Sequence, residues 1–191
     1  MTRATSLLLL LCLLFSCYGC SSLVAATRSG PIEDDYGKRS LGSFIDDSFI
    51  ETKAKVNLKK ADRQLAKAHI SVISFNGVAL LVGQVPSTKL KQRAGEVVGK
   101  IRGVKRVHNE LTEAGPLSVP ARSNDTWLTT KVKSKLLVAR NIKANRIKVV
   151  TENGVVYLLG LVSRDLGDRI VAAVRNTFGV QKIVRIFEYI E

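Results

Sequence analysis

The residues whose types and spacing best suit a binding surface are Trp127, the only tryptophan of the 191-residue chain, and Lys131, four positions later. On an α-helix this spacing places the indole and the ammonium group on one face, one turn apart. An aromatic ring beside a cation suits a boundary between water and acyl chains, which tryptophan prefers. The alternative is that Trp127 is a peripheral core residue and Lys131 a solvated charge.

The segment from Asn124 to Leu137 predicts an amphipathic helix around this pair. Leu128, Val132 and Leu136 recur at helical spacing and predict the stripe that faces the core. The neighbouring stripe and the Leu137-Val138 pair add exposed surface that the core does not need. We therefore predict that one face of this helix is a binding surface suited to a boundary between water and acyl chains. Its residues are Trp127, Thr130, Lys131, Ser134, Lys135, Leu137 and Val138.

A second chemistry, acylation of a cysteine, is indicated near the N-terminus. Residues 1–19 combine Arg3 with an apolar run and small residues, which predicts a secretory signal peptide too short to span a bilayer. The following Gly19-Cys20-Ser21-Ser22 resembles a bacterial lipobox, whose cysteine receives acyl chains such as palmitate and becomes the new N-terminus. We predict lipidation at Cys20, with Cys17 as the second choice. An ordinary secreted protein with an incidental cysteine is the alternative.

Composition limits the remaining possibilities. The chain carries 30 Lys+Arg against 16 Asp+Glu, a formal charge of +14, which favours an anionic partner without identifying it. All three cysteines lie in or beside the predicted signal peptide, so a disulfide framework is not expected. The two histidines, His69 and His108, occupy unlike positions, and no cofactor motif is present. We therefore expect no enzyme, no metal and no cofactor.

An internal repeat supplies the elements that position these residues. The segment beginning at Asp47 matches the segment beginning at Asp125, and the Asn76-Gly77 pair matches Asn153-Gly154. Each copy predicts a helix capped by its aspartate, a hairpin through Asn-Gly, a second helix and a closing strand that follows a Gly-Val pair. The second helices are predicted to reach about Arg102 and Phe178.

The repeated α-β-β-α-β order predicts an α+β fold, with two helices on one face of a three-stranded mixed sheet in each copy. Because each core is small, we expect the second face of the sheet to be partly covered by the sister domain or by a partner. The sequence predicts five successive segments. Residues 1–19 form the signal peptide, 20–41 the lipidated cysteine and tether, 42–112 domain 1, 113–122 a linker and 123–191 domain 2.

The duplicated unit resembles the BON domain, a family of exported or membrane-associated bacterial proteins. The resemblance rests on the helix start at Asp125, the Asn-Gly-Val of each hairpin and the Gly-Val before each closing strand. Together with the lipobox, it is similar to the tandem BON outer-membrane lipoproteins of enteric bacteria. It implies a lipid-anchored, periplasm-facing, non-enzymatic protein of the outer membrane that supports membrane integrity and binds anionic phospholipid such as phosphatidylglycerol or cardiolipin.

Two other binding functions remain as alternatives. A basic chain can bind nucleic acid, but aromatic residues are few here and an export signal leads away from nucleic acid, so no such partner is expected. An adaptor could instead bind envelope proteins or peptidoglycan through the basic surface or through a free sheet face.

Overall fold

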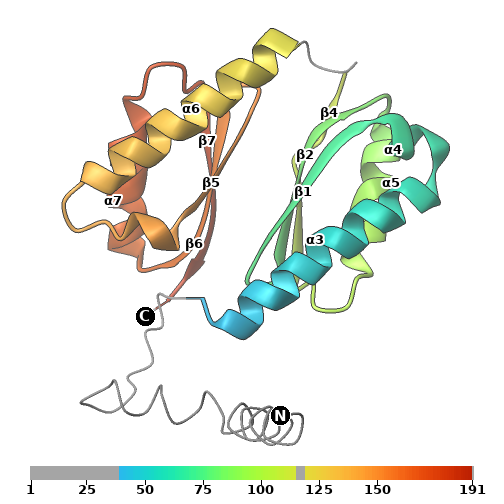
Figure 1. The fold of residues 1–191 in the computed structure, drawn as a ribbon, viewed down its shortest axis with the longest axis horizontal. Helices are drawn as coiled ribbons and strands as arrows, with labels where there is room; N and C mark the ends of the chain where they lie inside the picture. Colours follow the sequence, from blue (N-terminus) through green and yellow to red (C-terminus); the bar gives the residue numbers. More distant parts are fainter. Residues whose placement is uncertain (1–38, 115–118, 191) are drawn as a thin grey trace, which may run out of the picture. The chain divides into compact units, whose positions relative to one another are not determined.

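The computed structural model describes residues 39–114 and 119–190, with side chains from residue 124 onward in the second range (Figure 1). By its contacts the chain divides into Met1–Asp35 and Tyr36–Glu191, and every described residue belongs to the second unit. The predicted signal peptide, Cys17, Cys20 and most of the tether lie outside the described residues. Across those ranges, no helix has both the length and the apolar character that a membrane crossing requires.

Domain 1 contains three helices and a mixed sheet. Its elements are α3 (Leu41–Ala61), α4 (Arg63–Lys67), β1 (His69–Phe75), β2 (Val78–Val85), α5 (Thr88–Gly99), β3 (Arg106–Asn109) and β4 (Thr112–Glu113). Strand β1 pairs antiparallel with β2, while β3 and β4 both pair parallel with β2. Helices α3 and α5 lie on one face of this sheet (Figure 1).

Domain 2 repeats the arrangement with fewer pieces. Its elements are α6 (Val119–Val138), the 3₁₀ turn η1 (Ala144–Arg146), β5 (Lys148–Glu152), β6 (Val155–Val162), α7 (Arg164–Arg175) and β7 (Lys182–Tyr189). Strand β5 pairs antiparallel and β7 parallel with β6, in the order β5-β6-β7. The predicted α+β fold with two helices on a mixed sheet is therefore confirmed, with the additions of α4 and β4.

Both hairpins turn where the sequence predicts. Asn76 and Gly77 have φ values of 52° and 81°, and Asn153 and Gly154 have 49° and 73°. Two consecutive residues of positive φ form the tight turn that matches the twist of the flanking strands. The hairpins thus fix the register of each sheet, and each sheet packs its first helix through a buried stripe. The stripes are Ile50, Ala54 and Leu58 in α3, and Leu128, Val132 and Leu136 in α6.

The predicted capping role of Asp47 and Asp125 is wrong. Helix α3 begins at Leu41 after Ser40, whose side chain accepts the Ser43 N–H, and α6 begins at Val119, inside the predicted linker. Both aspartates therefore lie well inside their helices. Each is buried, and its carboxylate can satisfy backbone N–H groups of the adjacent hairpin turn, which have no partner within the turn.

The carboxylate of Asp47 accepts hydrogen bonds from the backbone N–H of Asn76 at 2.8 Å and of Gly77 at 2.9 Å. Asp125 accepts the equivalent bonds from Asn153 at 2.6 Å and Gly154 at 2.9 Å. Each aspartate thus latches its helix to the hairpin of the same domain.

The second helices end earlier than predicted. Helix α5 ends at Gly99 and α7 at Arg175, three residues before the predicted ends in each case. The next residues form tight turns, in which the N–H of Ile101 bonds to Val98 O and that of Thr177 to Val174 O. Phe178 therefore lies in the loop after α7 and not on a helix.

The second faces of the two sheets share one apolar cluster. Residues of β1 and β2 and residues of β6 and β7 belong to it, which confirms the expectation of cover from the sister domain. The ammonium group of Lys148 lies 3.0 Å from a carboxylate oxygen of Glu51, and Gln84 Nε2 donates to Glu152 at 2.7 Å. The buried members of the cluster are Phe75, Val78, Leu80, Val82, Tyr157, Leu159 and Ile186.

Candidate functional site

The pair singled out by the sequence forms a cation–π contact. The Lys131 Nζ atom lies 3.5 Å from the centroid of the Trp127 ring and 5.1 Å from the centroid of the Phe178 ring. Trp127 is 51% exposed and Phe178 is 83% exposed, so both rings reach solvent while they flank the ammonium group. Such flanking stabilises a cation at the surface by roughly 0.5–1 kcal/mol per ring.

A hollow of about 440 Å³ opens between α6 and the loop after α7. Five of the seven predicted binding residues line it, together with three residues of the loop. Leu137 and Val138 lie outside this lining and are strongly exposed at the C-terminal end of α6. The predicted lining residues are Trp127, Thr130, Lys131, Ser134 and Lys135, and the loop residues are Asn176, Thr177 and Phe178.

The polar groups of this hollow differ in whether they have a hydrogen-bond partner. Lys135 Nζ donates to the backbone oxygen of Asn176 at 2.7 Å, which joins α6 to the loop. The Thr130 hydroxyl donates to Thr126 O on its own helix. The buried hydroxyl of Thr177 has no hydrogen-bond partner among the described residues. A cation, an unpaired hydroxyl and two aromatic rings suit a ligand that joins an anionic group to an apolar part.

The loop residues were missed by sequence reasoning. The sequence pattern places Phe178 at the end of the second helix, whereas α7 ends at Arg175. The repeat held a usable signal, because Phe178 corresponds to Arg102, which precedes Gly103 in the first copy. An aromatic residue that replaces a charged one beside a turn glycine is not required by the shared fold.

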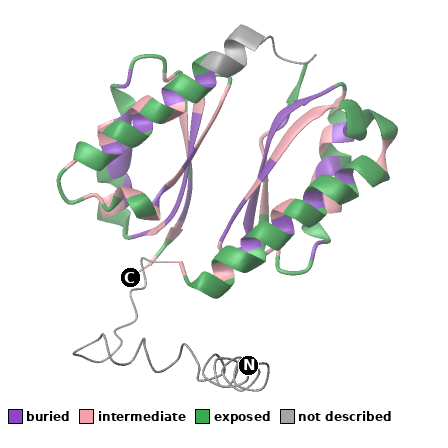
Figure 2. Cartoon of the chain, viewed as in Figure 1, coloured by how far each residue is buried: buried purple, intermediate pink, exposed green. Residues whose placement is uncertain are grey.

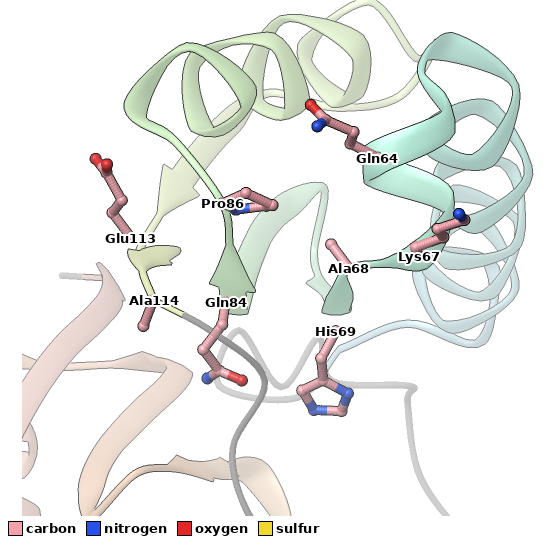
Figure 3. A pocket seen from close by; sticks show the side chains of 8 residues that line it. All are labelled: Gln64, Lys67, Ala68, His69, Gln84, Pro86, Glu113 and Ala114. Carbon is pink, nitrogen blue, oxygen red and sulfur yellow. The ribbon is translucent and has the colours of Figure 1, made fainter.

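A second hollow, of about 600 Å³, lies in domain 1 near the start of β1 and the end of β2 (Figure 3). Gln84 lines it, is 3% exposed, and has a side-chain oxygen without a hydrogen-bond partner in the described ranges. The remaining lining combines polar, charged and apolar residues. It has no counterpart of the cluster formed by Trp127, Lys131 and Phe178 in domain 2. It consists of Gln64, Lys67, Ala68, His69, Pro86, Glu113 and Ala114.

The two histidines lie on different strands, and His69 lines the hollow of domain 1. His69 begins β1, and His108 lies in β3. Burial, with the positive charge of Arg106, lowers the pKa of His108 against an opposing effect of Glu110. Among the described residues, no three His, Cys, Asp or Glu side chains are grouped so that they could hold a metal ion.

Comparison with known families identifies the two repeats. The BON domain model matches residues 46–115 and 124–190, one match for each sheet and its helices. The chain belongs to the BON domain family. These matches agree with the α-β-β-α-β order of the structure.

Three relatives share most of this length. The outer membrane lipoprotein DolP of Haemophilus influenzae is 37% identical over 153 residues, which cover 80% of this chain and 79% of DolP. A 21 kDa hemolysin of Actinobacillus pleuropneumoniae is 35% identical, with the same coverage of 80% and 79%. The osmotically-inducible protein Y of Escherichia coli is 31% identical over 171 residues, or 88% of this chain and 85% of that protein.

These relationships place the chain among the BON-family outer-membrane lipoproteins. The predicted location, lipid-anchored on the periplasmic side of the outer membrane, agrees with this relationship.

Proposed function

We propose that this protein binds anionic phospholipid through α6 and the loop that follows α7. The observation that carries the proposal is Lys131, whose ammonium group lies between the exposed rings of Trp127 and Phe178 at the edge of a hollow. The rings suit the boundary where headgroups meet acyl chains. The ammonium group suits a lipid phosphate, to which the free hydroxyl of Thr177 can donate a hydrogen bond.

Such a contact is weak by itself. A lysine near an anionic surface contributes roughly 1 kcal/mol, and Lys135 already donates to a backbone oxygen. Acylation at Cys20, with Cys17 as the second choice, would hold the domain near the bilayer, so that the second contact becomes effectively intramolecular. We therefore assign the protein a non-enzymatic role in outer-membrane integrity, with phosphatidylglycerol or cardiolipin as the lipid that α6 contacts.

The test is co-sedimentation of the chain from Ser21 to Glu191 with vesicles of phosphatidylglycerol or cardiolipin, compared with neutral phosphatidylcholine vesicles. Trp127→Glu should lower binding to the anionic vesicles, because a carboxylate then faces the lipid phosphates. The matched control is Asn145→Glu, which adds the same charge at an exposed position in η1. Equal binding by Trp127→Glu and the parent, with the fold intact by circular dichroism, would remove α6 from the site.

The second candidate function is an adaptor for envelope proteins or peptidoglycan. The hollow of domain 1 favours it, because the buried oxygen of Gln84 lacks a donor there. The sheet face predicted as a docking surface for the adaptor is buried in the cluster shared by the two sheets. Failure of the parent chain to bind any of these vesicles, with capture of one envelope protein that Gln84→Leu abolishes, would favour the adaptor.

A further inference from the structure

Helix α3 exposes more large apolar side chains than a packed helix needs. Ten large hydrophobic residues are exposed among the described residues, and five of them lie on this one helix. A helix that only covers a sheet normally shows charged and polar residues on its outer face. The five residues are Leu41, Phe44, Ile45, Phe49 and Val56.

Four of these residues lie on one face of α3, in a stripe that Thr52 interrupts between Phe49 and Val56. Leu41, Ile45, Phe49 and Val56 follow one another at helical spacing and share a face, with Phe44 beside them. They are 84%, 53%, 58% and 45% exposed. The buried core residues of α3 lie on the opposite face, and Figure 2 shows the outward face of this helix as exposed. The stripe is therefore not part of the core of domain 1.

The hydroxyl groups of the polar residues within the stripe donate hydrogen bonds to backbone oxygens of α3. The Ser48 hydroxyl donates to Phe44 O at 3.0 Å, and the Thr52 hydroxyl donates to Ser48 O at 2.9 Å. A hydroxyl group that is already bonded costs less to move out of water than a free one. This face can thus enter an apolar environment without leaving either hydroxyl group unpaired.

Few acidic side chains are exposed beside the stripe. Asp47 is turned inward to the hairpin, and Glu51 accepts from the Ser74 N–H and from Lys148. Asp46 is the one acidic residue of α3 that remains exposed beside the apolar turns. Lysines occupy the later turns of the helix, including Lys59 and Lys60 in the last one. The first turns are therefore mainly apolar and the last turns basic.

The position of the stripe in the chain indicates what covers it. The described chain begins at Arg39, whose guanidinium group bonds to Asp47 at 2.7 Å and lies 4.7 Å from the centroid of the Phe75 ring. This anchors the start of α3 against the sheet. A chain tethered to the outer membrane through its N-terminal segment therefore enters the fold at the most apolar end of α3.

We propose that the α3 stripe, Leu41, Ile45, Phe49 and Val56, inserts into the surface of the membrane to which the N-terminus is tethered. This contact is driven by burial of apolar side chains and does not depend on an anionic headgroup. It differs in this respect from the proposed contact of α6, where an ammonium group lies between two rings. The two contacts can be tested separately, since only one of them requires anionic lipid.

The first test uses neutral phosphatidylcholine vesicles in about 0.5 M salt, where charge attraction is screened within a few ångströms. The chain from Ser21 to Glu191 should bind them, and the double variant Ile45→Glu/Phe49→Glu should lose about tenfold or more of that binding. Trp127→Glu should bind as the parent does, and so should the control Gln92→Glu, at an exposed position of α5. Circular dichroism establishes that the variants fold.

The second test locates the helix directly. Phe49→Trp in a Trp127→Phe background gives a single reporter in α3, whose emission should shift to the blue and be quenched by brominated acyl chains. Three results would overturn the proposal: no binding of the parent to neutral vesicles, unchanged binding by the double variant, or a reporter that stays in water on sedimented vesicles. Self-association in solution that the double variant abolishes, without neutral-vesicle binding, would assign the stripe to a second copy of the chain.

Discussion

Helices α3 and α6 occupy equivalent places in the two domains but expose different chemistry. Both bury an aliphatic stripe against their own sheet, and both carry an aspartate that latches the hairpin. At the corresponding outward positions, α3 has Phe49 and Val56 where α6 has Trp127 and Ser134. The shared residues are those that the fold requires. The differences mark the positions at which we propose separate binding surfaces for the two copies.

The two aspartates also differ in the number of hydrogen bonds that their carboxylates accept. Asp47 accepts additional bonds from the Ser74 hydroxyl at 2.6 Å and from Arg39 at 2.7 Å. In domain 2 the counterpart of Ser74 is Thr151, whose hydroxyl pairs with Thr129 and not with Asp125. Burial alone would raise the pKa of Asp47, but the bonds from Ser74, Gly77, Asn76 and Arg39 outweigh it and hold this pKa below its ordinary value of 3.8.

The largest expected effect concerns these latches. Asp47→Asn should lower the free energy of unfolding of domain 1 by about 3 kcal/mol, because the amide cannot satisfy the same donors and leaves Arg39 unpaired. Asp125→Asn should lower that of domain 2 by about 2 kcal/mol, since fewer donors are lost. Urea unfolding measures both, with Trp127 fluorescence for domain 2 and circular dichroism for both domains. A larger loss in domain 2 would reverse the comparison.

A smaller effect is expected with pH. Because the pKa of Asp47 is lower in the folded protein than in the unfolded chain, its contribution is fully present above about pH 4 and is lost as the pH falls through the folded value. The difference in unfolding free energy between the parent and Asp47→Asn should therefore shrink below about pH 4. Urea unfolding at a series of pH values measures it. A constant difference down to pH 2 would contradict the lowered pKa.

The smallest expected effect separates the two surfaces. Lys131→Gln should weaken binding to phosphatidylglycerol vesicles about fivefold, which corresponds to one lysine at an anionic surface, and should reduce its salt dependence. Binding to neutral vesicles should not change, because the α3 stripe contains no lysine. Lys143→Gln is the matched control, at an exposed position away from the hollow. Equal losses in both variants would mean that only net charge matters.

Much of the fold followed from local patterns. Two positive-φ residues at each Asn-Gly turn are a local property, and the structure has them where the sequence predicts them. The starts of the first helices were not predictable in this way. An aspartate before an apolar periodic segment looks like a cap, and only the folded hairpin, nearly thirty residues later, shows what Asp47 bonds to.

In the candidate site, too, the residues of one helix were predictable from the sequence and the contact from a distant loop was not. Trp127, Lys131 and Ser134 lie on one helix, so their shared face followed from spacing alone. Phe178 contacts Lys131 from a loop more than forty residues later. The spacing of residues within α6 cannot predict that contact. The apolar character of α3 was partly visible at Phe49, but its extent required knowledge of where the helix begins.

We propose above all that α6 contacts anionic lipid through the cluster of Trp127, Lys131 and Phe178. Trp127 is the only tryptophan of the chain and therefore reports on this cluster without any substitution. The most direct measurement is its fluorescence during titration with phosphatidylglycerol vesicles that carry brominated acyl chains. We expect a blue shift and strong quenching of Trp127 in the parent chain. Neutral brominated vesicles with the Ile45→Glu/Phe49→Glu variant should give neither. Emission that stays at the wavelength of the free protein while the chain sediments with the vesicles would contradict this proposal.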